Sequence, residues 1–323
     1  MKDYFFLQKK VEENYLESIK NKIPKTLFSQ IQYAISLGGK KLRPNLLYYS
    51  YKTVSKNNSK IKFEDAKTFA LAIELLHNFT LIHDDIMDNA KIRRGKITLY
   101  EKFGTSSAIL VGDTIVSLAY EKILETKNLD AIKIFTKSFL DVCCGQEMDR
   151  NFSLSKKNIS LSKYFEMINL KTASLISASC EIGAIIACGT QNEIKSITNF
   201  GKNLGIAFQI QDDILDLYSN ENVFGKKIGG DILEEKQTYL TVKTNELATL
   251  NEKKLLKKLF IEIKKTKSQK KIIEVKSIFD KLKIVKYAKL DIQNFMQKAL
   301  NQIEPNKKKL LFNFSQSLLN RKF

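Results

Sequence analysis

The distribution of proline constrains the fold of this chain more than any other feature. The sequence has 323 residues and only three prolines, at Pro24, Pro44 and Pro305. Proline lacks an amide hydrogen and its ring clashes with the preceding helical turn, so β-rich and loop-rich chains usually carry it more densely than helical ones. No residue between Pro44 and Pro305 interrupts a helix by ring geometry. Long helices are therefore expected.

Apolar residues recur at helical spacing along most of the sequence. One such stripe lies within residues 69–79 and another within residues 165–175. This period is typical of amphipathic helices. Hydrophobic residues make up 43% of the chain, which is enough to bury a core in one large domain. No low-complexity linker or fixed-period repeat divides the sequence, so we predict an all-α protein with a single domain over residues 1–323.

The formal net charge of +19 comes mainly from lysine. Such a charge attracts nucleic acid or an anionic membrane surface. The lysines are spread along the chain and are densest from Lys253 to Lys309, as expected of solvated faces in a lysine-biased composition. We therefore predict no nucleic-acid partner, and leave open whether the lysine-rich C-terminal third contacts a membrane or another partner. Arginine is rare, and three of the five arginines lie in the two basic segments described below.

Cysteine, histidine and hydropathy exclude several classes of protein. The four cysteines form no CxxC pair and only two histidines are present, so no Cys/His zinc site is expected. Glu12 and Glu13 precede any apolar run, which argues against a signal peptide. The most apolar stretch, residues 174–189, is too short to span a membrane and contains Glu181. We expect a cytoplasmic protein with reduced thiols and no transmembrane segment.

The pattern Asp-Asp-x-x-Asp occurs twice in segments with helical periodicity. The six residues are Asp84, Asp85, Asp88, Asp212, Asp213 and Asp216. Because residues four apart lie on one helix face, the first and last Asp of each pattern project together. Clustered carboxylates on an apolar helix are unfavourable unless cations neutralise them, and magnesium prefers such oxygen ligands. A single pattern is also compatible with an acidic surface. Two with matching flanks indicate carboxylate pairs that face each other and bind magnesium.

Two basic segments provide donors for an anion. Lys40 and Arg43 follow Gly38-Gly39 in a glycine-started turn, and Arg93-Arg94 come just after the first acidic pattern. Arginine binds phosphate through two parallel hydrogen bonds, which a lysine cannot match. An exposed basic turn is the alternative interpretation of each segment. Their closeness to an acidic cluster favours phosphate held between metal and guanidinium.

Together these segments resemble the polyprenyl synthetase family, also called trans-isoprenyl diphosphate synthases. The resemblance rests on GGKKLRP, LIHDDIMDNAKIRRG, Lys171-Thr172, FQIQDDILD and GKKIGGDILEEK, and it covers the chain from about Gly38 to Lys236. It implies a single bundle of mostly antiparallel helices around a deep central cavity, usually in a homodimer. It also implies magnesium-dependent condensation of isopentenyl diphosphate with an allylic diphosphate.

The resemblance assigns a role to individual residues. Asp84 and Asp88 would ligate magnesium, with Asp85 in support, and Asp212 would bind a further magnesium. Asp213 and Asp216 would orient water on the metal, and Asp216 is included among the predicted metal ligands. The implied contacts of isopentenyl diphosphate are Lys40, Arg43, His77 and Arg94. The implied contacts of the allylic diphosphate are Arg93, Lys171, Lys226 and Lys236. Thr172 and Gln209 would lie near the developing carbocation. His77 alone is more typical of a core histidine, but it lies two helical turns before Asp84 and so on the same face.

The residues just before the first acidic pattern bear on product length. Phe79 lies five residues before Asp84, about 7.5 Å along the helix, and the smaller Thr80 lies four before it. By the resemblance, one bulky residue at the fifth position accompanies products near C20, geranylgeranyl diphosphate. Aromatic residues at both positions accompany farnesyl diphosphate, and small residues at both accompany longer chains. Phe79 is alternatively an ordinary core residue.

Three other functions fit parts of the sequence. A class I terpene cyclase carries an Asp-rich motif, but usually not a second DDxxD, and it lacks GGKxxRP. A catalytically inactive prenyltransferase subunit would have lost Asp-rich positions, whereas both are intact here. A basic helical nucleic-acid-binding protein explains the charge but not the acidic clusters. The predicted function is therefore a prenyltransferase, with a farnesyl or longer-chain synthase as the alternative.

Overall fold

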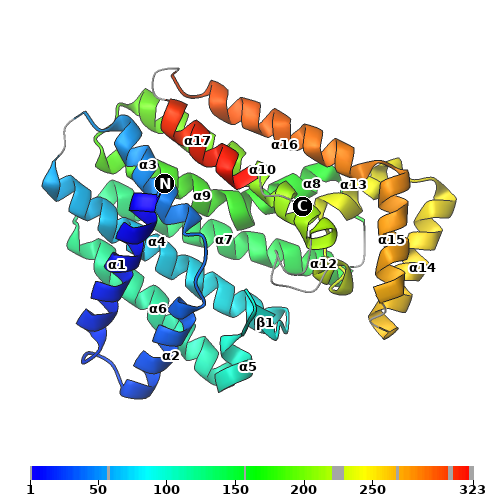
Figure 1. Cartoon of the computed structure of the whole chain (residues 1–323), viewed down its shortest axis with the longest axis horizontal. Helices are drawn as coiled ribbons and strands as arrows, with labels where there is room; N and C mark the ends of the chain where they lie inside the picture. Colours follow the sequence, from blue (N-terminus) through cyan, green and yellow to red (C-terminus); the bar gives the residue numbers. More distant parts are fainter. Residues whose placement is uncertain are drawn as a thin grey trace. The chain divides into compact units, whose positions relative to one another are not determined.

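The computed structural model describes residues 2–56, 59–155, 158–219, 229–266, 269–304 and 308–319. In these ranges the chain is almost entirely helical (Figure 1), which confirms the predicted all-α class. The α-helices are α1 (Lys2–Ile19), α2 (Lys25–Ser36), α3 (Leu42–Val54), α4 (Lys60–Met87), α5 (Leu99–Phe103), α6 (Thr105–Glu125), α7 (Leu129–Ser155), α8 (Leu161–Ile168), α9 (Ser174–Ile186), α10 (Gln191–Tyr218), α12 (Gly230–Leu233), α13 (Tyr239–Leu247), α14 (Leu250–Thr266), α15 (Gln269–Lys281), α16 (Ile284–Asn301) and α17 (Lys308–Leu319). A π-helix, η1 (Asn169–Ala173), joins α8 to α9.

Strand structure in the described part of the chain is confined to one small hairpin. Strands β1 (Ile92–Arg93) and β2 (Lys96–Ile97) pair antiparallel, with Arg93 opposite Lys96. The turn between them uses positive φ angles at Arg94 and Gly95. The hairpin directly follows the first acidic pattern on α4.

The chain divides into two compact units. Unit 1 comprises residues 1–139, 175–201 and 303–314, and unit 2 comprises residues 140–174, 202–302 and 315–323. Helices α7 and α10 each contribute residues to both units. The single domain and the deep central cavity stay predictions.

Unit 1 is organised around α4. This helix contacts α1, α2, α3, α5 and α6. Residues 69–76 of α4 are buried without interruption, which is the pattern of a helix surrounded on all sides rather than of a surface helix. The N-terminus of α4 is capped by Ser59, whose hydroxyl accepts the Lys62 amide hydrogen at 3.4 Å. The acidic pattern therefore extends from a helix that the core holds firmly.

Unit 2 contains the second acidic pattern at the C-terminal end of α10. Helix α13 contacts α8 and α16, and α15 contacts α14 and α16. Figure 1 shows α14 and α15 running side by side, in yellow and orange. Tyr164 of α8 and Tyr239 of α13 are among the most deeply buried side chains, and the Tyr164 hydroxyl and the Tyr239 backbone amide both donate to Asp213. Across the described ranges, none of the helices combines the length and hydropathy that a membrane span requires.

Candidate active site

The 38–44 turn, which comprises the loop at residues 38–41 and the first three residues of α3, begins the unit 1 part of the site. Gly38, Gly39 and Lys41 have positive φ angles of 74°, 144° and 49°. The φ of Gly39 is one that residues with a side chain rarely adopt, and a Cβ there would lie 2.5 Å from Nη1 of Arg94, so glycine fits this position without displacing the guanidinium. Lys41 is the N-cap residue of α3, and Pro44 lies in the first turn, where its missing amide hydrogen costs no helical bond.

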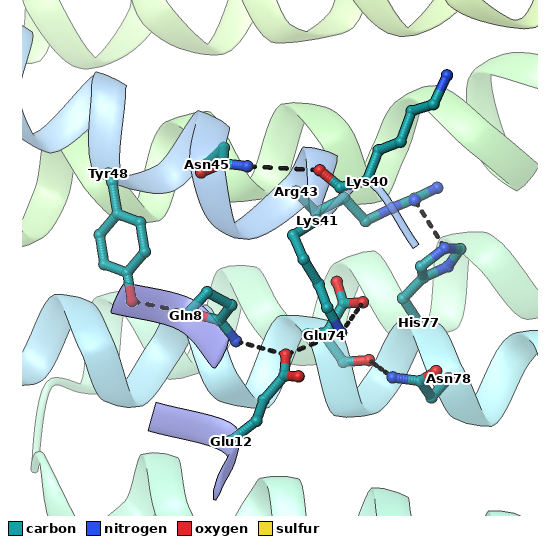
Figure 2. A network of polar contacts seen from close by, with 10 residues as sticks. All are labelled: Gln8, Glu12, Lys40, Lys41, Arg43, Asn45, Tyr48, Glu74, His77 and Asn78. Carbon is teal, nitrogen blue, oxygen red and sulfur yellow. Dashed lines mark hydrogen bonds and ion pairs between the residues drawn. The ribbon is translucent and has the colours of Figure 1, made fainter. Parts of the chain in front are cut away.

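Cations surround His77 on α4. Nη1 of Arg43 lies 3.0 Å from Nε2 of His77 (Figure 2). Burial, and then the charges of Arg43, Arg94, Arg93 and Lys41, hold the pKa of His77 well below its ordinary value. The imidazole is therefore neutral, and its unprotonated Nε2 accepts the guanidinium hydrogen bond. A concentration of positive charge around a neutral histidine suits an anionic ligand.

The first acidic pattern is bound to the hairpin by arginine. The buried carboxylate of Asp85 accepts a hydrogen bond from Nε of Arg93 at 2.7 Å, and Nη2 of Arg93 lies 3.6 Å from Asp84. Asp88 donates its amide hydrogen to the Asp84 carbonyl, so the two carboxylates lie one helical turn apart. Asp84 and Asp88 are partly exposed, whereas Asp85 is buried. Asp85 therefore positions Arg93, and Asp84 and Asp88 form the accessible pair.

In the second acidic pattern, the middle residue is the most tightly held. The buried Asp213 accepts hydrogen bonds from the Tyr164 hydroxyl at 2.7 Å, the Tyr239 amide at 2.7 Å and Nε2 of Gln209 at 2.8 Å. Burial, with a smaller contribution from the Asp231 charge, raises the pKa of Asp213 to about 7, although its three hydrogen bonds oppose this. Asp213 therefore links α10 to two other helices of unit 2, α8 and α13.

The outer residues of this pattern differ in exposure. Asp216 is buried, and its Oδ2 accepts the Asp231 amide hydrogen at 3.1 Å. Its backbone carbonyl accepts the Gly229 amide hydrogen at 2.9 Å. Asp212 is partly exposed. Of the two predicted metal ligands in this pattern, Asp212 is thus the more accessible.

The donor sets fit magnesium that is shared with a substrate. Within the described ranges, no three His, Cys, Asp or Glu side chains are grouped so as to hold a metal by themselves. Magnesium in phosphate-transferring sites is commonly held by one or two carboxylates, with phosphate oxygens and water as the other ligands. The accessible pair Asp84 and Asp88 on one unit, and Asp212 on the other, each match this requirement.

A π-helix presents two of the predicted site residues in unit 2. Lys171 and Thr172 lie in η1, a rare conformation that is frequent at functional sites. Nζ of Lys171 lies 2.5 Å from Oδ2 of Asp149, and the Thr172 hydroxyl donates to Oε1 of Gln209 at 2.7 Å. A Cβ on Gly145 of α7 would collide with the Lys171 backbone, so glycine lets α7 approach η1 closely.

The remaining predicted site residues are placed as follows. Phe79 is partly buried, and its ring packs on His83 with centroids 4.3 Å apart and edge-on to Phe139 at 5.3 Å. The Thr80 hydroxyl donates to the His77 carbonyl at 2.8 Å. Lys236 forms an ion pair with Glu234 at 2.8 Å. Lys226 lies outside the described residues.

Several residues that shape the site are absent from the sequence-based prediction. Asp149 lies four residues after Gly145, so the two residues share a face of α7. This spacing is the one signal in the sequence that could have indicated Asp149 as a site residue. Tyr164 and the partners of Lys41, namely Glu12 and Glu74, have no motif of their own. Their roles depend on contacts between distant parts of the sequence.

Comparisons with known proteins identify relatives over most of the chain. Residues 24–279 match the family described as polyprenyl synthetase. The short chain isoprenyl diphosphate synthase of Methanothermobacter thermautotrophicus is 35% identical over 91% of this chain and 88% of its own length. The geranylgeranyl diphosphate synthase of Sulfolobus acidocaldarius is 40% identical over 74% of this chain and 73% of its own. A crystal structure of geranylgeranyl pyrophosphate synthase superimposes with a TM-score of 0.85 at 36% identity, covering 98% of this chain and 99% of that one.

The hydrogen bonds to Asp213 predict a large effect on stability. Replacing Asp213 by Ala leaves the Tyr164 hydroxyl and the Tyr239 amide without their acceptor, at about 1–3 kcal/mol for each buried donor. Urea unfolding should report the loss. The control Asp113→Ala removes an exposed carboxylate from α6 and should change the free energy of unfolding by no more than about 0.5 kcal/mol. Equal effects in the two variants would contradict the role of Asp213.

Proposed function

The chain belongs to the polyprenyl synthetase family, and we propose that it condenses isopentenyl diphosphate with an allylic diphosphate to give geranylgeranyl diphosphate. One observation carries the proposal most directly. In unit 1, Arg43, the neutral His77 and Arg94 gather next to the Arg93-bound acidic pattern. Diphosphate binding requires this combination of cationic donors and carboxylates.

The cationic groups bind diphosphate and stabilise its departure. We assign Lys40, Arg43, His77 and Arg94 to isopentenyl diphosphate. Arg93, Lys171, Lys226 and Lys236 are assigned to the allylic diphosphate. Breaking the allylic C–O bond leaves both electrons on the diphosphate and a delocalised cation on the carbon chain. Fixed cations stabilise the developing negative charge, since they are in place before the bond breaks. Magnesium bound by Asp84, Asp88, Asp212 and Asp216 would add Lewis-acid stabilisation of the same charge.

Carbon–carbon bond formation needs no protein nucleophile. The double bond of isopentenyl diphosphate supplies the electron pair to C1 of the allylic cation, and a proton then leaves to restore a double bond, with the departed diphosphate as its acceptor. Thr172 and Gln209 are proposed to place oxygen atoms near the cation. The Thr172 hydroxyl bonds to Gln209, and Asp213 holds the amide nitrogen of Gln209, so these oxygens have fixed positions.

The product length is proposed to depend on Phe79. Its ring contacts the rings of His83 and Phe139 in unit 1, and Thr80, one residue closer to Asp84, is small. A bulky residue at the first position and a small one at the second fits a chain that stops at geranylgeranyl diphosphate. The geranylgeranyl diphosphate synthases among the relatives support geranylgeranyl diphosphate as the product.

Two further properties are proposed. One is assembly as a homodimer, which the family resemblance implies; helix α6 exposes Ile109 and Leu110, the latter to 61%. The other is a cytoplasmic location, because all four cysteines are free thiols and the cytoplasm keeps thiols reduced.

The acidic patterns give a direct test of the catalytic assignment. Asp84→Asn and Asp212→Asn should each lower turnover by about two orders of magnitude or more, because each removes a ligand whose effect grows in the transition state. Incorporation of labelled isopentenyl diphosphate into the product measures this loss, and circular dichroism checks folding. The matched control is Asp130→Asn, which alters a carboxylate that is 80% exposed on α7. Wild-type turnover in both site variants would refute the assignment.

The chain-length proposal predicts opposite effects at neighbouring positions. Phe79→Ala opens an apolar cavity that another isoprene unit can enter, so the products should lengthen. Thr80→Phe adds a ring nearer the acidic pattern and should shorten the product by about one unit, since one helical turn of about 5.4 Å roughly matches an extended isoprene. Chromatography of the products measures both changes.

Stability must be controlled in this pair. Truncating a packed phenylalanine costs up to about 3–5 kcal/mol, so each variant is first shown to be folded by circular dichroism. An unchanged product distribution from folded Phe79→Ala would make Phe79 an ordinary core residue. Longer or unchanged products from Thr80→Phe would place the growing chain on another face of α4.

A further inference from the structure

Lys41 is a buried lysine in a backbone conformation that lysine rarely adopts. Its side chain is 7% exposed, and its φ of 49° lies in the left-handed region. Nζ lies 2.9 Å from Oε1 of Glu12 on α1 and 3.2 Å from Oε1 of Glu74 on α4, and both carboxylates are buried (Figure 2). A strained backbone conformation persists only where the surrounding contacts hold it in place, and residues with such conformations cluster at functional sites.

The buried charges are held in an extended network. The Tyr48 hydroxyl donates to Oε1 of Gln8 at 3.1 Å, and Nε2 of Gln8 donates to Oε1 of Glu12 at 3.0 Å. Burial alone would lower the pKa of the Lys41 ammonium, but the two carboxylates raise it above its ordinary value, so Lys41 stays charged. Buried ion pairs of this kind add little net stability, because desolvation offsets their attraction. Their effect is to hold the Lys41 side chain in one orientation.

That geometry determines where the neighbours of Lys41 point. Figure 2 shows the side chains of Lys40 and Lys41 leaving the turn on opposite sides, so the inward anchoring of Lys41 leaves Lys40 exposed. Glu74 and His77 lie three residues apart on one face of α4. Glu74 holds Lys41, and His77 holds Arg43. Residues 38–44 are thus bound to α4 at two positions about 5 Å apart along the helix axis. Glu12 on α1 provides a third contact.

We propose that Lys41, held by Glu12 and Glu74, is a positioning residue for isopentenyl diphosphate. The proposal rests on the proposed function. Lys41 touches no substrate. It fixes the 38–44 turn so that Lys40 and Arg43 present their charges to the diphosphate. A lysine that served only to hold α1 in place would affect stability and would leave substrate preference unchanged.

The test compares Lys41→Met with Ile19→Ala. Methionine keeps the length of the side chain but removes the ammonium. Ile19 is fully buried on the same helix as Glu12, so its truncation weakens α1 packing without altering the ion pairs. Both variants are measured at a temperature where each is fully folded. We expect Lys41→Met to raise the KM for isopentenyl diphosphate about tenfold and the KM for the allylic diphosphate less than about twofold. Lys41→Arg, which keeps the cation, should recover most of the difference.

Hydrogen exchange gives a second measurement that needs no turnover. The peptide covering residues 38–45 should lose protection in Lys41→Met and keep it in Ile19→Ala. If Lys41→Met does not fold, the double variant with Glu74→Gln, which also removes one of the buried carboxylates, replaces it in both measurements.

The outcomes separate the two proposals. Equal changes in both KM values, or the same changes in Ile19→Ala at a matched loss of Tm, would overturn the positioning role. Unchanged protection of residues 38–45 would overturn it as well. A wild-type protein that forms no prenyl diphosphate would overturn the proposed function, while hydrogen exchange would still decide whether Lys41 clamps the turn.

Discussion

The neutralisation of charge on α4 is the constraint on which the unit 1 site depends. This helix is buried on all sides over residues 69–76, and yet it carries Glu74, His77 and the first acidic pattern. Buried ionised or polar groups require partners, because the interior cannot solvate them. Each is matched by a cation from a neighbouring turn: Lys41 for Glu74, Arg43 for His77 and Arg93 for Asp85. The glycine turn and the hairpin are therefore placed by the carboxylates of α4 and by its neutral His77, and the hairpin brings Nη2 of Arg93 to 3.6 Å from Asp84.

Unit 2 satisfies its buried charges mainly with hydrogen bonds. Asp213 accepts three hydrogen bonds, and Asp216 accepts one from a backbone amide. Lys171 forms an ion pair with Asp149. The same hydrogen bonds fix Gln209 and, through it, Thr172. In both units, the middle aspartate of the pattern is buried and occupied by protein donors, and the first stays partly exposed. Because both patterns have a buried middle aspartate and a partly exposed first one, they support the same role for Asp84 and Asp212, which is to bind a cation together with a diphosphate.

Local features of the sequence predicted the helical class, because proline content and hydrophobic period act within a few turns. They also indicated candidate site residues in compact motifs, such as Asp84, Arg43 and Arg93, whose roles stay predictions. What they could not predict depends on distant contacts. Lys41 is one lysine among many in the sequence, and its burial requires Glu12 from another helix. The π-helix at residues 169–173 lies close to Gly145 on α7, a contact between residues more than twenty positions apart. The roles of the site residues, the single domain and the central cavity stay predictions.

We propose that this chain elongates an allylic diphosphate with isopentenyl diphosphate in a magnesium-dependent reaction. The most direct measurement is chromatography of the products formed from radiolabelled isopentenyl diphosphate with each allylic primer, in magnesium and again with a chelator. We predict geranylgeranyl diphosphate as the longest major product in magnesium, and no product with the chelator. The absence of any prenyl diphosphate in magnesium, or undiminished synthesis with the chelator, would contradict this account.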